Sequence, residues 1–213
     1  MLRRTAIFAV LAWLLASAAS AQVAMLTQVS GDVRVSGSSG ARPAVPFLKV
    51  NDGDTLMLAA DAKVQMVYLT GGRQEIWTGA GPVQVGAREG GSGTLTPQAS
   101  QVPALVLRQL EKTPAVGQHG KTGMVTLRNT DVLEALDTLE KDYSDYRAQA
   151  AADDVTPEVF YLTGLIDLQD YARAAKVIQD LEAKSRTLAS YAAVVEHFGR
   201  LLAEARASAP KRQ

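Results

Sequence analysis

The chain lacks cysteine altogether in its 213 residues, which excludes disulfide bonds, thiolate metal sites and lipid attachment through cysteine. It also lacks an excess of charge, because its 22 basic and 22 acidic residues balance and are interspersed along the sequence. No basic block could neutralise a run of phosphates, so we expect neither nucleic-acid binding nor attraction to an anionic membrane surface. Such a chain must be stabilised by buried apolar surface alone, for which its length suffices.

Catalytic and metal-binding patterns are missing as well. The two histidines, His119 and His197, form no H-x-x-x-H pair, so a zinc site lacks ligands. There is no G-x-S-x-G elbow, and the glycine-rich segment 90–93 lacks the lysine of a phosphate loop. We therefore predict a protein that is not an enzyme, with no catalytic residues, no cofactor and no metal.

The acidic residues are predicted to be structural. Asn51-Asp52-Gly53-Asp54 offers too few oxygen ligands for a calcium loop, so it is predicted to be a turn in which Gly53 has a positive φ. Glu158, Glu182 and Glu196 are expected at solvated helix positions. Sequence spacing does not exclude a pair of carboxylates brought together from distant segments. A hydrolase or lyase that acts on cell-wall material, with a site between two domains, is therefore the alternative.

Only one apolar run is long, at residues 6–16, and it follows two arginines at positions 3 and 4. A charged start, a short apolar helix and the small residues at 19–21 are the three parts of a secretory signal peptide. The run is shorter than the roughly 20 residues that span a bilayer. We expect cleavage between Ala21 and Gln22 and export to the periplasm, with no membrane span left afterwards. The alternatives are an uncleaved anchor, as in a truncated transmembrane regulator, and a buried helix.

Residues 22–87 show short, β-branched segments separated by glycine-rich turns. Val33 and Val35 alternate with polar residues, and the segment 63–69 begins in alternation and then becomes continuously apolar. The second pattern is typical of a strand that is buried on both faces at one end. Further strands are expected around Ile76-Trp77 and Val83-Gln84-Val85. This spacing predicts an all-β sandwich or roll.

Residues 88–129 are predicted to be a linker with one short helix. The segment 86–101 consists largely of small and polar residues, and no packed element is expected there. A helix should follow, with Pro103 at its first position and Val106 and Leu110 on one face. Residues 113–121 resemble a loop, and Met124 to Leu127 could form a strand that returns to the β domain.

From residue 130 to 207 the apolar residues recur with helical spacing. A first helix buries one stripe of residues: Val132, Leu136, Leu139, Tyr143 and Tyr146. Thr156-Pro157-Glu158 predicts a cap and a first-turn proline for a short second helix at residues 160–168, and Asp170 predicts the cap of a third. A fourth precedes a disordered tail at 208–213. The expected fold class is α+β with segregated domains, an N-terminal sandwich or roll and C-terminal antiparallel helical hairpins.

The β half resembles the FecR-like domain of bacterial envelope proteins. The resemblance lies in Ser30-Gly31-Asp32-Val33-Arg34-Val35, in Val50-Asn51-Asp52-Gly53-Asp54-Thr55-Leu56, in the strand 64–69 and in the segment 71–77. It implies an extracytoplasmic sensing or interaction module. The chain lacks the inner-membrane helix and cytoplasmic segment of the signalling members, so the resemblance does not extend to sigma-factor control.

The helical half resembles a degenerate tetratricopeptide-type pair. Tyr161-Leu162-Thr163-Gly164-Leu165 and Asp170-Tyr171-Ala172-Arg173-Ala174 carry this resemblance, which implies a small residue where two helices touch. Together the two resemblances favour an exported interaction module that binds a protein partner or an envelope polymer. Trp77 and Arg73 are the residues that we expect to contact such a partner. For Trp77, core packing is the competing and favoured interpretation.

Overall fold

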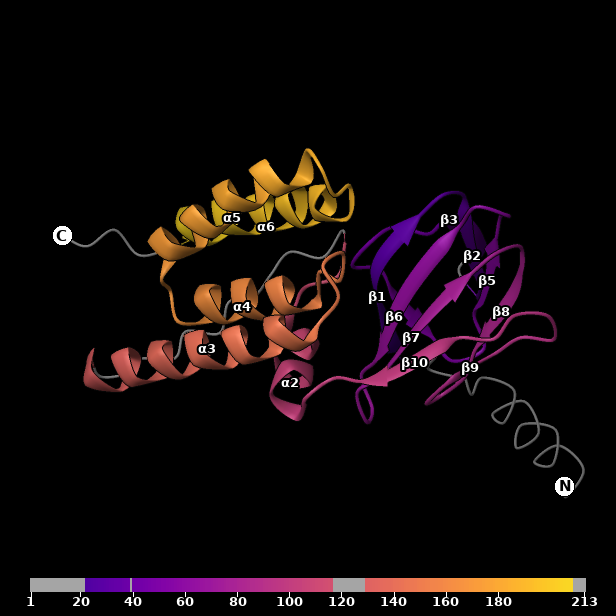
Figure 1. Ribbon diagram of the computed structural model, residues 1–213, viewed down its shortest axis with the longest axis horizontal. Coiled ribbons are helices and arrows are strands. Elements are labelled where there is room, and N and C mark those ends of the chain that lie inside the picture. The colour runs from indigo at the N-terminus through magenta and orange to yellow at the C-terminus, as the bar shows by residue number, and fades with distance from the viewer. Residues whose placement is uncertain (1–21, 39, 117–128, 209–213) are drawn as a thin grey trace, which may run out of the picture.

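Two five-stranded antiparallel sheets form the N-terminal half of the computed structural model, which describes residues 22–38, 40–116 and 129–208 (Figure 1). Sheet A contains, in spatial order, β10 (Gln98–Gln101), β7 (Arg73–Thr78), β6 (Lys63–Tyr68), β1 (Gln22–Ser30) and β4 (Lys49–Asn51). Sheet B contains β3 (Gly40–Pro43), β2 (Val33–Gly37), β5 (Thr55–Leu58), β8 (Gly81–Val85) and β9 (Gly90–Gly91). The two sheets pack face to face around one apolar cluster, so the predicted β sandwich is confirmed.

Strand β6 lies in the middle of sheet A and is buried on both faces. Val64, Met66 and Tyr68 belong to the cluster between the two sheets. Val67 points the other way and packs in a second cluster, together with residues of the helices. Successive side chains on a strand alternate between faces, and the continuous apolar run supplies both layers. The prediction for this segment is confirmed.

The prediction that residues 86–101 hold no packed element is wrong. Strand β9 pairs with β8, and β10 pairs with β7 from Gln98 to Gln101. All four residues of β10 are exposed, so this strand is held by its backbone ladder and has no apolar pattern to reveal it. The β domain therefore continues to Gln101, and its boundary lies beyond residue 87.

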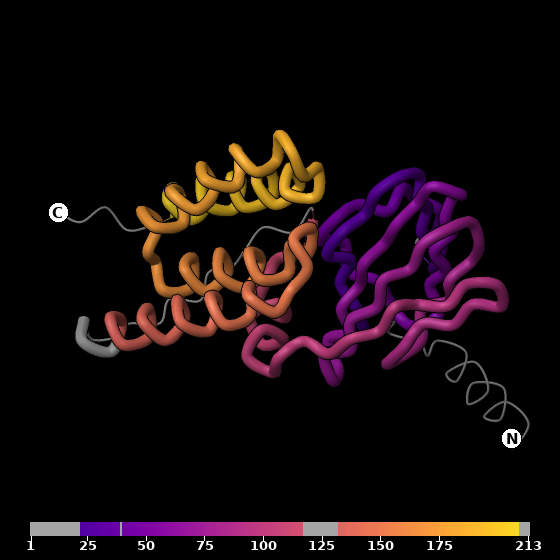
Figure 2. The backbone as a smooth tube through the Cα atoms, in the orientation of Figure 1, coloured from indigo at the N-terminus to yellow at the C-terminus, as the bar shows by residue number. Residues whose placement is uncertain are grey.

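Five described helices form the C-terminal half: α2 (Ala104–Lys112), α3 (Asn129–Gln149), α4 (Thr156–Asp167), α5 (Tyr171–Ser185) and α6 (Ser190–Ser208). Helices α3 to α6 run alternately in opposite directions (Figure 2), which confirms the predicted antiparallel hairpins. Helix α2 buries Val106 and Leu110 as predicted, but it begins at Ala104, and Pro103 is the residue that precedes it. No described helix is long and apolar enough to span a membrane.

Local signals set the ends of two helices. Asp170 accepts a hydrogen bond from the Arg173 N–H at 3.0 Å, so its predicted capping role is confirmed. Helix α4 begins before Phe160, and Thr156 is its first residue instead of its cap. Val155 stands at the cap position without a side-chain capping bond, and Asp154 Oδ1, one residue earlier, accepts the Thr156 N–H at 2.9 Å.

Gly164 marks the place where α4 approaches α3. A Cβ atom at this glycine would lie 2.6 Å from Leu139 Cδ1, so any side chain here would require the Leu139 side chain to move. A small residue at a helix contact is what the tetratricopeptide-type resemblance implied for this position.

The two halves pack directly on each other. Met25, Phe47 and Val67 of the β half share one buried cluster with residues of α2 to α6. The helices cover the side of sheet A that faces away from sheet B, next to β1 and β6 (Figure 1). The two halves thus meet along a continuous interface. The predicted signal peptide, His119, the possible strand at 124–127 and residues 209–213 lie outside the described residues.

Candidate functional site at the junction

A buried polar network joins sheet A to the segment before α4. Gln65 Nε2 donates to Asp154 Oδ1 at 2.8 Å and to Thr156 Oγ1 at 3.0 Å, while Gln74 Nε2 donates to Asp154 Oδ2 at 3.2 Å. These four residues are at most 7 % exposed. Gln74 Oε1 makes no hydrogen bond to a described residue, but both amide donors are paired with Asp154. Because burial of an unpaired polar group is costly, these paired groups favour one position of the helices against the sheet.

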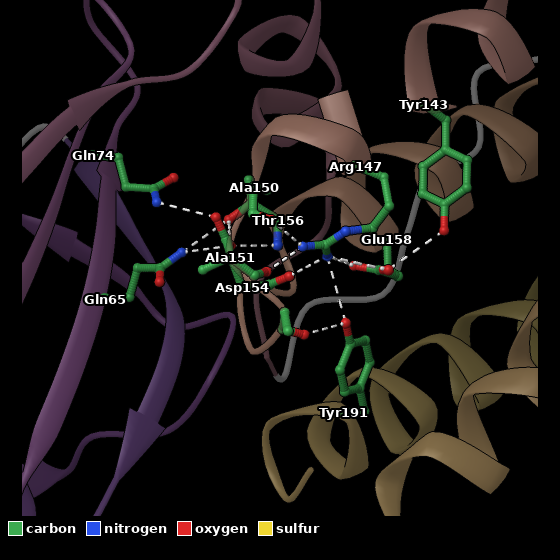
Figure 3. A network of polar contacts seen from close by, with 11 residues as sticks. Gln65, Gln74, Tyr143, Arg147, Ala150, Ala151, Asp154, Thr156, Glu158 and Tyr191 are labelled. Carbon is green, nitrogen blue, oxygen red and sulfur yellow. Dashed lines mark hydrogen bonds and ion pairs between the residues drawn. The ribbon is translucent and has the colours of Figure 1, made fainter. Parts of the chain in front are cut away.

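Arg147 extends the network into the helical half (Figure 3). Its guanidinium donates to the backbone carbonyls of Ala150, Ala151 and Asp154 and lies 3.0 Å from Glu158 Oε2. The Glu158 side chain is 0 % exposed, so the prediction that this residue is solvated is wrong. Glu182 and Glu196 are exposed, as predicted.

Burial dominates the protonation of this cluster. It raises the pKa of Glu158 above its usual value, and the positive charge of Arg147 opposes this rise. Burial together with the Glu158 charge raises the pKa of Tyr191 to about 12, and the same two causes raise the pKa of Tyr143. Both tyrosines are therefore hydrogen-bonding groups at neutral pH, and the cluster connects α3, α4 and α6 to one another.

A groove opens beside this network, between the end of β1 and the α5–α6 connection. It has a volume of about 340 Å³, at the lower end of the ~300–1,000 Å³ range of ligand pockets. Both halves contribute to its lining, which we call the junction groove: Gln28, Val29, Ser30, Pro46, Lys63, Asp153, Thr187, Leu188, Ala189, Ser190 and Ala193.

The junction groove holds one ion pair and two unused polar groups. Lys63 Nζ lies 2.7 Å from Asp153 Oδ2, and this contact lowers the pKa of Asp153. Gln28 Oε1 and Ser190 Oγ are buried and make no hydrogen bond to any described residue. Among the described lining residues, Asp153 is the only carboxylate and none is a histidine, so these residues do not supply the two acids that the alternative hydrolase would need.

Trp77 and Arg73 lie elsewhere, on one face of β7. Trp77 is 1 % exposed, which confirms the core interpretation and leaves no indole surface for a partner. Its Nε1 donates to Glu75 Oε2 at 3.0 Å, and Arg73 Nε donates to Glu75 Oε1 at 2.6 Å. Residues 73, 75 and 77 share a face because strand side chains alternate. Arg73 is 37 % exposed and remains a predicted contact residue.

Two further predicted residues have structural surroundings. His197 on α6 is 3 % exposed and stacks on Phe47 with a centroid separation of 4.4 Å. Gly53 has a φ of 85°, and the Asn51 N–H donates to Asp54 Oδ2 at 2.9 Å, so the predicted turn is confirmed. In the described part of the chain, no three histidine, aspartate or glutamate residues gather as a metal site would require.

Comparisons of this chain with protein-family models, with curated proteins and with solved structures give no match. The junction groove was not foreseen from the sequence, because its lining comes from five separate segments. One signal was present, namely Gln28 and Gln65 within otherwise apolar strands. Polar residues at such positions need partners or face a site, but their position does not reveal which.

Proposed function

We propose that this protein is an exported, non-catalytic binding module of the bacterial envelope that holds a partner in the junction groove. The single observation that carries this proposal is that both halves line the groove while a buried network locks them together. Binding sites are usually preformed and favour the boundary between domains. A partner bound here contacts a preformed surface, so binding loses little free energy to the ordering of the groove.

Cleavage between Ala21 and Gln22 is compatible with the described fold. Strand β1 starts at Gln22, the first residue after the proposed cleavage site, and Val23 and Ala24 are already buried. Cleavage there leaves every described strand and helix intact. The resemblance of the β half to extracytoplasmic FecR-like domains points to the same location.

We expect the protein purified from the periplasm of expressing cells to begin at Gln22. Intact mass spectrometry measures this directly, and replacement of Ala19 and Ala21 by bulky residues should retain the leader and raise the mass. A full-length chain recovered from the membrane fraction would contradict export by cleavage.

Photo-crosslinking inside bacterial cells tests the binding role. A photoreactive amino acid at Ala193, in the groove lining, should give a discrete adduct of higher mass. The same group at Met57, which is 48 % exposed on β5 of the opposite sheet, is the matched control and should give none. Equal labelling at the two positions, or none at either, would count against the junction groove as a binding site.

A further inference from the structure

Strand β1 has an open edge inside the junction groove. On the side facing β4, its hydrogen bonding ends at Leu26, which donates to the Leu48 carbonyl at 2.9 Å and accepts from the Phe47 N–H at 2.6 Å. The register of β1 against β6 then shifts between Leu26 and Gln28. Among the described strands, residues 28–30 pair with β6 alone.

Pro46 is the reason that the ladder stops. It is the next residue along the neighbouring segment, and proline has no N–H to donate to β1. The chain turns away at this point, and Pro46 becomes a wall of the groove. An unpaired strand edge beside a cavity is a template on which an extended segment of another chain can add.

The unused polar groups of the groove fit the same kind of ligand. The Gln28 side chain carries an amide and Ser190 a hydroxyl, so each can both donate and accept a hydrogen bond. Peptide groups present a donor and an acceptor at every residue, and they can pair with both side chains and with the strand edge.

The remaining lining argues against other ligands. Lys63 is the one cation among the described lining residues, and its pairing with Asp153 means that these residues offer no unpaired positive charge to a phosphate or another anion. None of the lining residues in the described part of the chain is aromatic, so none of them can stack against a sugar ring. Val29, Leu188 and Ala193 provide an apolar wall suited to small aliphatic side chains.

We propose that the junction groove binds an extended segment of a partner protein, which adds as a strand to residues 28–30 of β1. This inference rests on the proposed binding role of the groove and specifies its ligand. The partner segment donates and accepts backbone hydrogen bonds along the β1 edge, and its side chains face the wall formed by the α5–α6 connection.

The test uses the purified protein and a phage-displayed library of random nine-residue peptides. Peptides that are selected on the wild-type protein should be lost when the selection is repeated on Ala193→Trp, because the added indole fills the groove. Met57→Trp, which adds an indole on the opposite sheet, is the matched control. A selected peptide should bind at least tenfold more weakly to Ala193→Trp and equally well to Met57→Trp. Methylation of every second backbone nitrogen removes N–H donors of the peptide but keeps its side chains. Two such peptides can be made, methylated at odd or at even positions, and one of them should bind at least tenfold more weakly.

Nuclear magnetic resonance gives a readout that a general surface effect does not produce. The peptide should slow amide hydrogen exchange in residues 28–30 and shift the resonances of 189–193. If no peptide is selected, or if both N-methylated forms bind fully, strand addition is wrong. Chitotetraose, a glycan without peptide, distinguishes failure of the binding role from failure of the peptide ligand. Groove-dependent binding of this sugar alone would support the groove as a binding site and overturn the peptide ligand. Photo-crosslinking at Ala193 that yields no adduct would count against both.

Discussion

Replacement of Arg147 by methionine is expected to lower the free energy of unfolding by about 3–5 kcal/mol, since it leaves a buried carboxylate without its counter-charge. The Glu158 side chain is 0 % exposed and keeps only the Tyr143 hydroxyl, 3.4 Å away, as a side-chain partner. The carbonyls of Ala150 and Ala151 lose their donor as well. Urea denaturation followed by circular dichroism measures the loss.

Two variants serve as controls for this experiment. Arg173→Met removes an arginine that is 44 % exposed and paired with Glu140 and Asp170 at the surface, so it should cost at most about 1 kcal/mol. Adding Glu158→Gln to Arg147→Met removes the stranded charge and should restore part of the stability. The double variant is compared with the single variants Arg147→Met and Glu158→Gln. If its loss in the free energy of unfolding equals the sum of their two losses, Arg147 and Glu158 are not coupled, and the network does not work as proposed.

The destabilisation by Arg147→Met should also depend on pH. Burial raises the pKa of Glu158, so the folded state takes up a proton at a higher pH than the unfolded state does. For such a group, stability falls as pH rises above the unfolded value near 4.3. Without Arg147 the pKa rises further, so the loss should be largest near pH 8 and shrink toward pH 5. A loss that is constant over this range would contradict an uncompensated charge.

The sandwich could be predicted from local sequence because its strands carry apolar alternation that reflects burial. Val33, Val35, Val83 and Val85 all lie in the core between the sheets. Strand β10 carries no such pattern, because its residues are exposed and its pairing with β7 uses the backbone alone. Hydrophobic patterns in a sequence reflect side-chain burial, and an edge strand of exposed polar residues has no such pattern.

The junction could not be predicted, since its contacts join residues far apart in the chain. Gln65 meets Asp154 across 89 positions, and the wall of the groove opposite Gln28 is formed by residues 187–193. Glu158 has the same local sequence signature as a solvated helix residue, and only the tertiary position of Arg147 makes its burial tolerable. The environment of such a residue depends on where its helix docks, and helical periodicity alone does not predict the docking position.

Acidification should destabilise the protein through His197, which lies next to the junction. Its imidazole stacks on Phe47, and its Nδ1 lies 3.2 Å from Arg200 Nη2. Burial and the Arg200 charge lower the pKa of His197 to about 4, with a smaller opposing effect of the Pro114 carbonyl. Phe47 itself has a φ of 63°, a strained conformation that its packing between His197 and Phe198 maintains.

The sign of the effect follows from which state binds the proton. The unfolded chain protonates its histidine near pH 6.5, while the folded protein resists until about pH 4, so stability is full above 6.5 and falls as pH drops toward 4. Between pH 7 and pH 5 the loss from this residue should be about 2 kcal/mol. Its replacement by methionine should abolish that part of the pH dependence while leaving the contribution of the carboxylates unchanged.

Urea denaturation of the wild type and of His197→Met at pH 7 and pH 5 measures this difference. An equal loss in both proteins would show that His197 does not titrate in this way.

Ala193 lies one helical turn before His197 on the same face of α6, and Pro46 directly precedes Phe47. We therefore expect protonation of His197 to weaken the support of two walls of the junction groove. Any ligand of the groove should then bind more weakly at pH 5 in the wild type than in His197→Met.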